Sequence, residues 1–274
     1  MSAIDDTSAA TGAAGGATVA TNGIDLAYTE RGSGEPLVLI MGLGADRSAW
    51  DAHVAAYEKR FRCFAVDNRG SGASSKPGGP YSTAEMADDY AGLIRSLGAG
   101  PVRVAGISMG GAIAQELALR HPELVERLLL VSSWARCDDY TKEIFRHFSR
   151  MRGAASPGEF ARLLQLWIWT PAYLNAHLEE LREARREPAT MPQHAFDAQC
   201  AACIDHDTVG RLADIGVPTL ITAGDRDIFT PLALAAELHE HIPGSSLKVF
   251  PGTGHVHHWE VLDEFNEFTT EWLR

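Results

Sequence analysis

The chain has 274 residues, with 36 acidic and 24 basic side chains and a formal net charge of −12 at pH 7. The acidic balance, and a sequence without a basic run interleaved with aromatic residues, argue against a nucleic-acid partner. Because no stretch approaches the roughly 20 apolar residues of a membrane span, we expect no membrane partner either.

Residues 1–17 are rich in Ala, Gly, Ser and Thr and lack the charged and apolar regions of a signal peptide. We expect them to form a disordered tail on a cytoplasmic protein, and the sequence leaves a homodimer open. The cysteines are scattered in a chain long enough to fold without disulfides, and Cys200-Ala-Ala-Cys203 lacks the second pair that a zinc site would require. Neither a metal nor a cofactor is predicted.

From residue 17 onward, strand and helix patterns alternate. Residues 17–21 and 24–28 predict a hairpin on the Asn22-Gly23 turn. The apolar run 37–40 is typical of a strand buried on both faces of a parallel sheet. Further strands are predicted at 61–66, 101–105, 127–131, 217–222 and 247–250, and helices near 48–50 and at 83–97, 112–119 and 259–274.

This alternation predicts an α/β fold with a doubly wound, mostly parallel sheet, whose ligands bind at the carboxyl ends of the strands. Residues 134–213 interrupt it with helical periodicity broken by prolines. We therefore expect a core of residues 18–133 and 214–274. Residues 134–213 would form a helical cap, or lid, inserted over the strand ends.

The segment Gly106-Ile107-Ser108-Met109-Gly110 lies between a predicted strand and a predicted helix. G-x-S-x-G in this context is the pattern of a nucleophile elbow. Glycines two residues on either side let the strand and the helix approach each other, and the helix N-terminus places its positive dipole end beside the hydroxyl. Ser108 is therefore the predicted nucleophile.

Asp227 and His255 follow the predicted strands 217–222 and 247–250 and lie at the same sheet edge as Ser108. A serine hydroxyl needs a base to remove its proton, and the base needs a carboxylate to orient it. The chain order Ser, Asp, His is the order expected for this type of sheet. The alternative acids are Asp225, Asp138 and Asp139, and the neighbouring alternatives to His255 are His257 and His258.

An oxyanion formed during attack would need two backbone donors. The N–H of Met109 follows the nucleophile directly. The N–H of Leu43 lies in the glycine-rich turn Met41-Gly42-Leu43-Gly44, which ends a strand expected beside the elbow. We expect these two groups to form the oxyanion hole.

These motifs resemble those of the α/β-hydrolase superfamily over the chain from about residue 19 onward. The matching segments are Met41-Gly-Leu-Gly44, Asp67-x-Arg69-Gly70-x-Gly72-x-Ser74, Gly106-x-Ser108-x-Gly110, Gly224-x-x-Asp227 and Gly254-His255.

Within the superfamily the chain resembles the 3-oxoadipate enol-lactonase and small carboxylesterase group, and its ending is also similar to that of meta-cleavage product hydrolases. The resemblance implies an α/β-hydrolase fold, Ser108 as nucleophile, Asp227 as acid, His255 as base, and Leu43 and Met109 as oxyanion donors. One departure is Met41, where many members carry histidine, which puts the hydrogen bonding of this loop in question.

Aromatic residues at helical spacing fill the expected cap, where such residues form a core or face a pocket. We expect Trp134, Trp167 and His258 to line the substrate pocket. The expected substrate is a hydrophobic or aromatic ester or lactone, cleaved through an acyl-enzyme. Two alternatives stay open: a carbon–carbon hydrolase, in which Arg136 or His147 would stabilise a dienolate, and a non-catalytic ligand receptor.

Overall fold

The computed structural model describes residues 16–184 and 191–274. Within these residues, eight strands form one sheet in the order β1-β2-β4-β3-β5-β6-β7-β8. The hairpin β1–β2 and the pair β2–β4 are antiparallel, and the other neighbours are parallel, so the sheet is mostly parallel, as predicted. The strands are β1 (Ala17–Thr21), β2 (Ile24–Arg31), β3 (Glu35–Ile40), β4 (Phe61–Val66), β5 (Val102–Ile107), β6 (Val125–Val131), β7 (Thr219–Gly224) and β8 (Ser246–Phe250).

The first strand has the bounds predicted for it, 17–21, and so overlaps the end of the expected tail by one residue. Ala17, assigned to the expected tail, is the first residue of β1, and residues 1–15 lie outside the described residues. Asn22 and Gly23 both have positive φ, which is the conformation that a two-residue hairpin turn requires.

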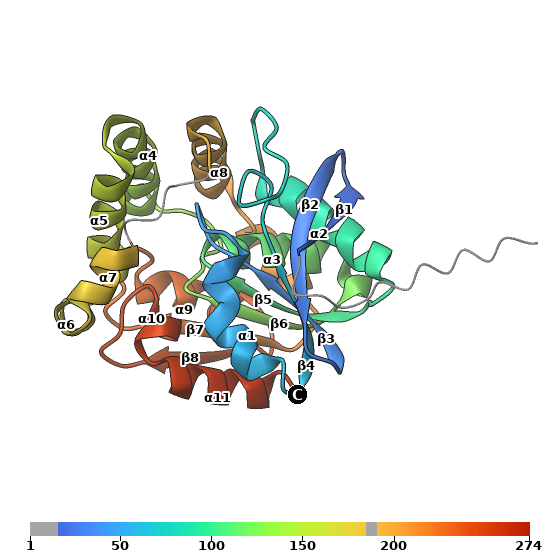
Figure 1. Ribbon diagram of the computed structural model, residues 1–274. Coiled ribbons are helices and arrows are strands. Elements are labelled where there is room, and N and C mark those ends of the chain that lie inside the picture. The colour runs from blue at the N-terminus through green and yellow to red at the C-terminus, as the bar shows by residue number, and fades with distance from the viewer. Residues whose placement is uncertain (1–15, 185–190) are drawn as a thin grey trace, which may run out of the picture.

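Side chains of the central strands alternate between two hydrophobic clusters. Figure 1 shows the helices that lie on the two faces of the sheet. On β3, the buried side chains of Val38 and Ile40 join one hydrophobic cluster, and those of Leu37 and Leu39 join another. The first cluster includes α2 (Thr83–Leu97), α3 (Met109–Arg120) and α9 (Leu232–His241), and the second includes α1 (Asp51–Tyr57) and α11 (Leu262–Trp272). Helices therefore cover both faces of the sheet, and functional groups are expected at the ends of the strands.

Helices also fill the chain between β6 and β7. They are α4 (Asp139–Ala154), α5 (Pro157–Ile168), α6 (Pro171–Ala176), α7 (Leu178–Ala184) and α8 (Gln193–Asp205), and we refer to them together as the cap. Figure 1 shows α4, α5 and α8 standing beyond the sheet. Prolines open α5 and α6, and Ser156 and Glu159 form a capping box on α5, so the breaks in periodicity mark helix starts.

The C-terminal helix is divided, whereas one helix was predicted over 259–274. A short helix α10 (His257–Glu260) precedes α11, and Val261 between them has non-helical dihedral angles. Glu260 is tied to the cap, because its carboxylate accepts hydrogen bonds from the N–H (2.7 Å) and the hydroxyl (2.9 Å) of Thr170. No helix in residues 16–184 and 191–274 is long and apolar enough to cross a bilayer.

Candidate active site

Ser108 occupies a one-residue turn between β5 and α3. The strand ends directly before it, and the helix starts directly after it rather than at residue 112. Its dihedral angles, φ 55° and ψ −117°, are strained for a non-glycine residue. A Cβ on Gly106 would lie 2.2 Å from the Gly110 carbonyl oxygen, and a Cβ on Gly110 would lie 2.2 Å from the Ile40 carbonyl oxygen. The two glycines of the motif are therefore required for strand and helix to meet at Ser108.

Asp227 and His255 form a buried hydrogen-bonded pair in the loops that follow β7 and β8. Oδ2 of Asp227 lies 2.8 Å from Nδ1 of His255. Oδ1 of Asp227 accepts hydrogen bonds from the N–H groups of Phe229 (2.8 Å) and Thr230 (2.9 Å). Because a carboxylate only accepts, the His255 Nδ1 carries a proton, and in the neutral ring Nε2 is the basic nitrogen.

Sequence reasoning missed Thr230, whose buried hydroxyl touches both members of this pair. Its Oγ1 lies 2.7 Å from Oδ2 of Asp227 and 3.0 Å from Nδ1 of His255. The ring of Phe229 also packs against His255, with 4.5 Å between the two ring centroids. A hydroxyl residue directly before Pro231, in the loop that carries the acid, was the signal available in the sequence.

Ser132 and Ser133, directly after β6, connect the serine turn to the histidine loop. The Ser133 hydroxyl donates to the carbonyl oxygen of Ser108 (3.1 Å), and the Ser132 hydroxyl donates to that of His255 (2.6 Å). Among the hydrogen bonds of the described residues, none joins Ser108 Oγ to His255 Nε2. Catalytic hydrogen bonds are often long or misaligned before substrate binds. The backbone of both residues is nevertheless fixed at one sheet edge.

The loop Met41–Gly44, which we call the oxyanion loop, lies against the serine. A Cβ on Gly42 would be 3.3 Å from Cβ and 3.9 Å from Oγ of Ser108. The Met41 carbonyl oxygen accepts a hydrogen bond from Asn68 Nδ2 (2.7 Å), which holds the loop although histidine is absent at position 41. The N–H groups of Leu43 and Met109 have no hydrogen-bond partner among the described residues. Neither N–H is taken up by another acceptor in the described part of the chain, as the predicted oxyanion hole requires.

The alternative acids have structural contacts of their own. Oδ1 of Asp138 accepts from the Thr141 N–H (2.8 Å) and caps α4, and Asp139 is the first residue of that helix. Oδ1 of Asp225 accepts from the Gly252 N–H (2.6 Å) and joins two loops. These contacts leave Asp227 as the carboxylate that reaches His255.

Two of the three expected pocket residues are fully buried among other side chains. Trp134 is fully buried, and its ring packs against Phe145 (5.3 Å between centroids). His258 is fully buried on the side of α11, and its ring lies 5.3 Å from that of His53. Trp167 keeps exposed surface and packs edge-on against Phe148. Of the three, Trp167 alone keeps exposed surface.

His257 and His258 are buried neutral groups. Burial lowers the pKa of His257 to about 3 and lowers the pKa of His258 well below its ordinary value. Nδ1 of His257 lies 3.1 Å from Oγ of Ser132, and its Nε2 lies 3.0 Å from Oγ1 of Thr222. His257 thus supports the carboxyl ends of β6 and β7, and His255 is the histidine of this segment that contacts a carboxylate.

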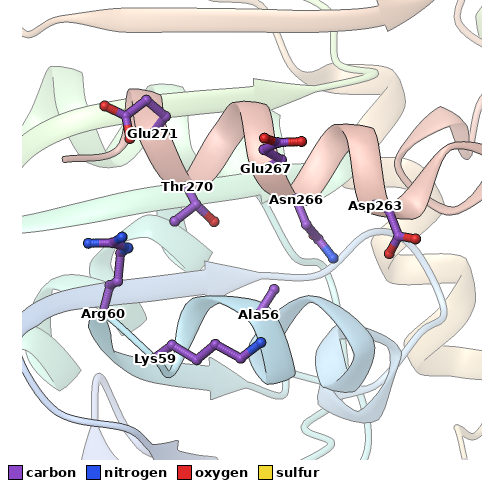
Figure 2. Close-up of a pocket in the computed structure, with 8 residues that line it drawn as sticks. All are labelled: Ala56, Lys59, Arg60, Asp263, Asn266, Glu267, Thr270 and Glu271. Atoms are coloured by element: carbon purple, nitrogen blue, oxygen red, sulfur yellow. The ribbon is translucent and has the colours of Figure 1, made fainter.

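The four cysteines are free and buried, and no group of three or more His, Cys, Asp or Glu side chains in the described ranges could hold a metal ion. A groove of about 490 Å³ lies between α1 and α11. Figure 2 shows the residues that line it. Lys59 and Arg60 line one side and acidic residues of α11 the other, and Ser108, Asp227 and His255 are not among its lining residues. This groove is separate from the candidate site.

Comparison with known proteins places the chain in a family. The profile of the α/β-hydrolase fold family matches residues 35–261. RutD of Azorhizobium caulinodans, a proposed carbamate hydrolase, is 33% identical over 248 residues, which cover 89% of this chain and 92% of RutD.

Two solved structures share the fold over almost the whole chain. A hydrolase from Pseudomonas aeruginosa has a TM-score of 0.87 at 28% identity and covers 96% of this chain and 99% of its own. The enol-lactonase from Burkholderia xenovorans has a TM-score of 0.87 at 27% identity and covers 94% and 99%, respectively. The chain therefore belongs to the α/β-hydrolase fold family, and the relatives compared with it are hydrolases.

Proposed function

We propose that the protein is a serine hydrolase that cleaves a carboxylic ester or lactone through an acyl-enzyme. The observation that carries this proposal is the buried Asp227–His255 pair at the sheet edge where Ser108 is held in a strained turn. A strained serine turn and a buried carboxylate–imidazole pair at one sheet edge are typical of a catalytic site.

In the proposed reaction, Ser108 Oγ attacks the acyl carbon while Nε2 of His255 takes its proton. Asp227 stabilises the imidazolium through its contact with Nδ1. The N–H groups of Leu43 and Met109 bind the oxyanion, and each such donor contributes about 3–4 kcal/mol of transition-state stabilisation. His255 then protonates the leaving alcohol, and water, activated by the same histidine, releases the acid and regenerates Ser108.

An apolar acyl or alcohol group fits the surroundings of the proposed base. The rings of Phe229 and Phe148 lie 5.3 Å apart, and Phe229 also packs on His255. Trp167 extends this aromatic cluster towards the surface of the cap. We infer a hydrophobic or aromatic ester or lactone as the substrate, and the enol-lactonase relative is consistent with a lactone.

Carbamate hydrolysis is the second candidate, because the RutD relative is proposed to have that activity. The same serine would then form a carbamoyl-enzyme. The carbon–carbon hydrolase alternative has less support, since the side chain of Arg136 is 56% exposed and pairs with Glu237, and His147 is exposed on α4. A receptor would not need the contacts that hold Asp227 against His255.

The test is a panel of aryl esters, aryl lactones, aryl carbamates and ring-fission diketones, assayed with the wild type, Ser108→Ala and the control Ser96→Ala on α2. We expect ester or lactone turnover that is lost in Ser108→Ala and kept in Ser96→Ala, with both variants folded by circular dichroism. Turnover that survives in Ser108→Ala would refute the mechanism. Turnover confined to carbamates or diketones would replace the proposed substrate, and saturable binding without turnover would favour a receptor.

A further inference from the structure

Gln199, on α8 of the cap, is hydrogen-bonded to the oxyanion loop. Its side chain is fully buried, and Oε1 accepts a hydrogen bond from the Gly44 N–H (3.1 Å). Nε2 donates to the carbonyl oxygen of Arg69 (2.9 Å) and to the hydroxyl of Ser71 (3.1 Å). The carbonyl oxygen and both amide hydrogens of Gln199 are thereby used, which fixes the orientation of the amide.

The surface of α8 fits closely over the two turns that Gln199 joins. Gly44 has φ +74°, and a Cβ on it would lie 2.8 Å from the ring of Phe196, one turn before Gln199. A Cβ on Gly70 would lie 3.1 Å from Cβ of Ala195 and 3.5 Å from Nε2 of Gln199. Glycine at both positions lets the helix backbone come close enough for a glutamine side chain to reach the loop.

The oxyanion loop is consequently anchored on both sides of the Leu43 N–H. On one side, Asn68 from the core holds the Met41 carbonyl oxygen (2.7 Å), and on the other, Gln199 from the cap holds the Gly44 N–H (3.1 Å). Asn68 is itself fixed by the hydroxyl of Tyr90, which donates to its Oδ1 (2.7 Å). The peptide that carries the Leu43 N–H lies between these two fixed points.

We infer that Gln199 is a positioning residue that makes the oxyanion hole depend on the cap. This inference rests on the proposed function, in which the Leu43 N–H binds the oxyanion. Oxyanion donors act only when they are held in place before the charge develops. Removing the contact to Gly44 allows the loop to shift, and a displacement of this kind reduces the rate of the chemical step more than it reduces substrate binding.

The test compares Gln199→Met with Gln165→Met. Gln165 is a buried glutamine of α5 whose Nε2 donates to the carbonyl oxygen of Leu181 (3.0 Å), within the cap. Both changes remove a buried side-chain amide at similar volume. We expect Gln199→Met to lower kcat roughly 10- to 100-fold with little change in KM, and Gln165→Met to keep the wild-type kcat.

Hydrogen exchange supplies a readout that does not need turnover. The Gly44 amide should exchange faster in Gln199→Met than in the wild type, and at the wild-type rate in Gln165→Met. A wild-type kcat in Gln199→Met, or an equal loss of kcat in both variants, would overturn the inference. If the wild type hydrolyses none of the panel, the proposed function fails, and the exchange rates alone test whether Gln199 anchors the loop. Unchanged protection of the Gly44 amide in Gln199→Met would then overturn the anchoring role.

Discussion

Replacing Thr230 by valine removes one hydroxyl from the Asp227–His255 pair and keeps the shape of the side chain. Asp227 has four hydrogen-bond contacts: two backbone N–H groups on Oδ1, and His255 Nδ1 and Thr230 Oγ1 on Oδ2. A hydrogen bond to a charged group contributes about 1.5–3 kcal/mol. Because three contacts remain, we expect Thr230→Val to destabilise the fold by about 1–2 kcal/mol, measured by urea denaturation.

The effect on activity should be smaller than the effect of changing the carboxylate itself. Because the backbone donors still orient Asp227, we expect Thr230→Val to lose only about 1.4 kcal/mol of transition-state stabilisation. This loss lowers kcat/KM roughly tenfold. Asp227→Asn should lower kcat by roughly 10⁴-fold, as for the corresponding change in serine proteases, because asparagine favours the wrong tautomer of His255. Thr230→Ser, which restores the hydroxyl, should recover most of the activity. Steady-state kinetics on the best ester of the panel measures all three.

Two results would exclude this role of the Thr230 hydroxyl. Thr230→Val with wild-type kcat/KM would mean that the hydroxyl does not contribute to orienting the pair. Equal losses in Thr230→Val and Thr230→Ser would mean that packing, and not the hydrogen bond, is responsible for the effect.

Three further changes test other parts of the account. Gly42→Val puts its Cβ 3.2 Å from the Ile107 carbonyl oxygen and 3.3 Å from Cβ of Ser108, so kcat should fall at least tenfold. Circular dichroism checks that the variant is folded, and unchanged turnover would exclude the loop from the site. Asp138→Ala removes the N-cap of α4 and should lower the free energy of unfolding by about 1 kcal/mol while kcat stays unchanged. A large loss of kcat would restore Asp138 as a candidate acid. Burial lowers the pKa of His206 and His257 to about 3, so below about pH 6.5 these histidines bind protons in the unfolded chain but not in the folded one. The free energy of unfolding should therefore fall by about 1 kcal/mol per histidine between about pH 6.5 and pH 5.5. Denaturant melts at both pH values check this, and equal stability would contradict it.

The sheet could be predicted from the sequence because the residues that specify each strand are close together in the chain. Apolar runs such as 37–40 and the Asn22-Gly23 turn specify strands and a hairpin without reference to the rest of the chain. The strand-turn-helix context of Ser108 is equally local. Asp227 and His255 could be named because parallel strands bring their carboxyl ends to one edge, so that position in the chain implies position in space.

Contacts made across the fold could not be predicted. Gln199 reaches Gly44 over 155 residues, and nothing in its neighbourhood distinguishes it from other polar residues of a helix. The surroundings of Trp134 and His258 could not be predicted for a related reason. A large ring next to a predicted site serves equally well as core or as pocket wall, and the choice depends on neighbours such as Phe145 and His53 that are distant in sequence.

Covalent labelling shows whether Ser108, His255 and Asp227 act in series. A fluorophosphonate ester should react with the wild type, and mass spectrometry of the digested protein should find the adduct on Ser108. His255→Ala should slow that reaction by at least a hundredfold, in line with the loss of a general base. An adduct on another residue, or labelling of Ser108 at the same rate in His255→Ala, would contradict the account.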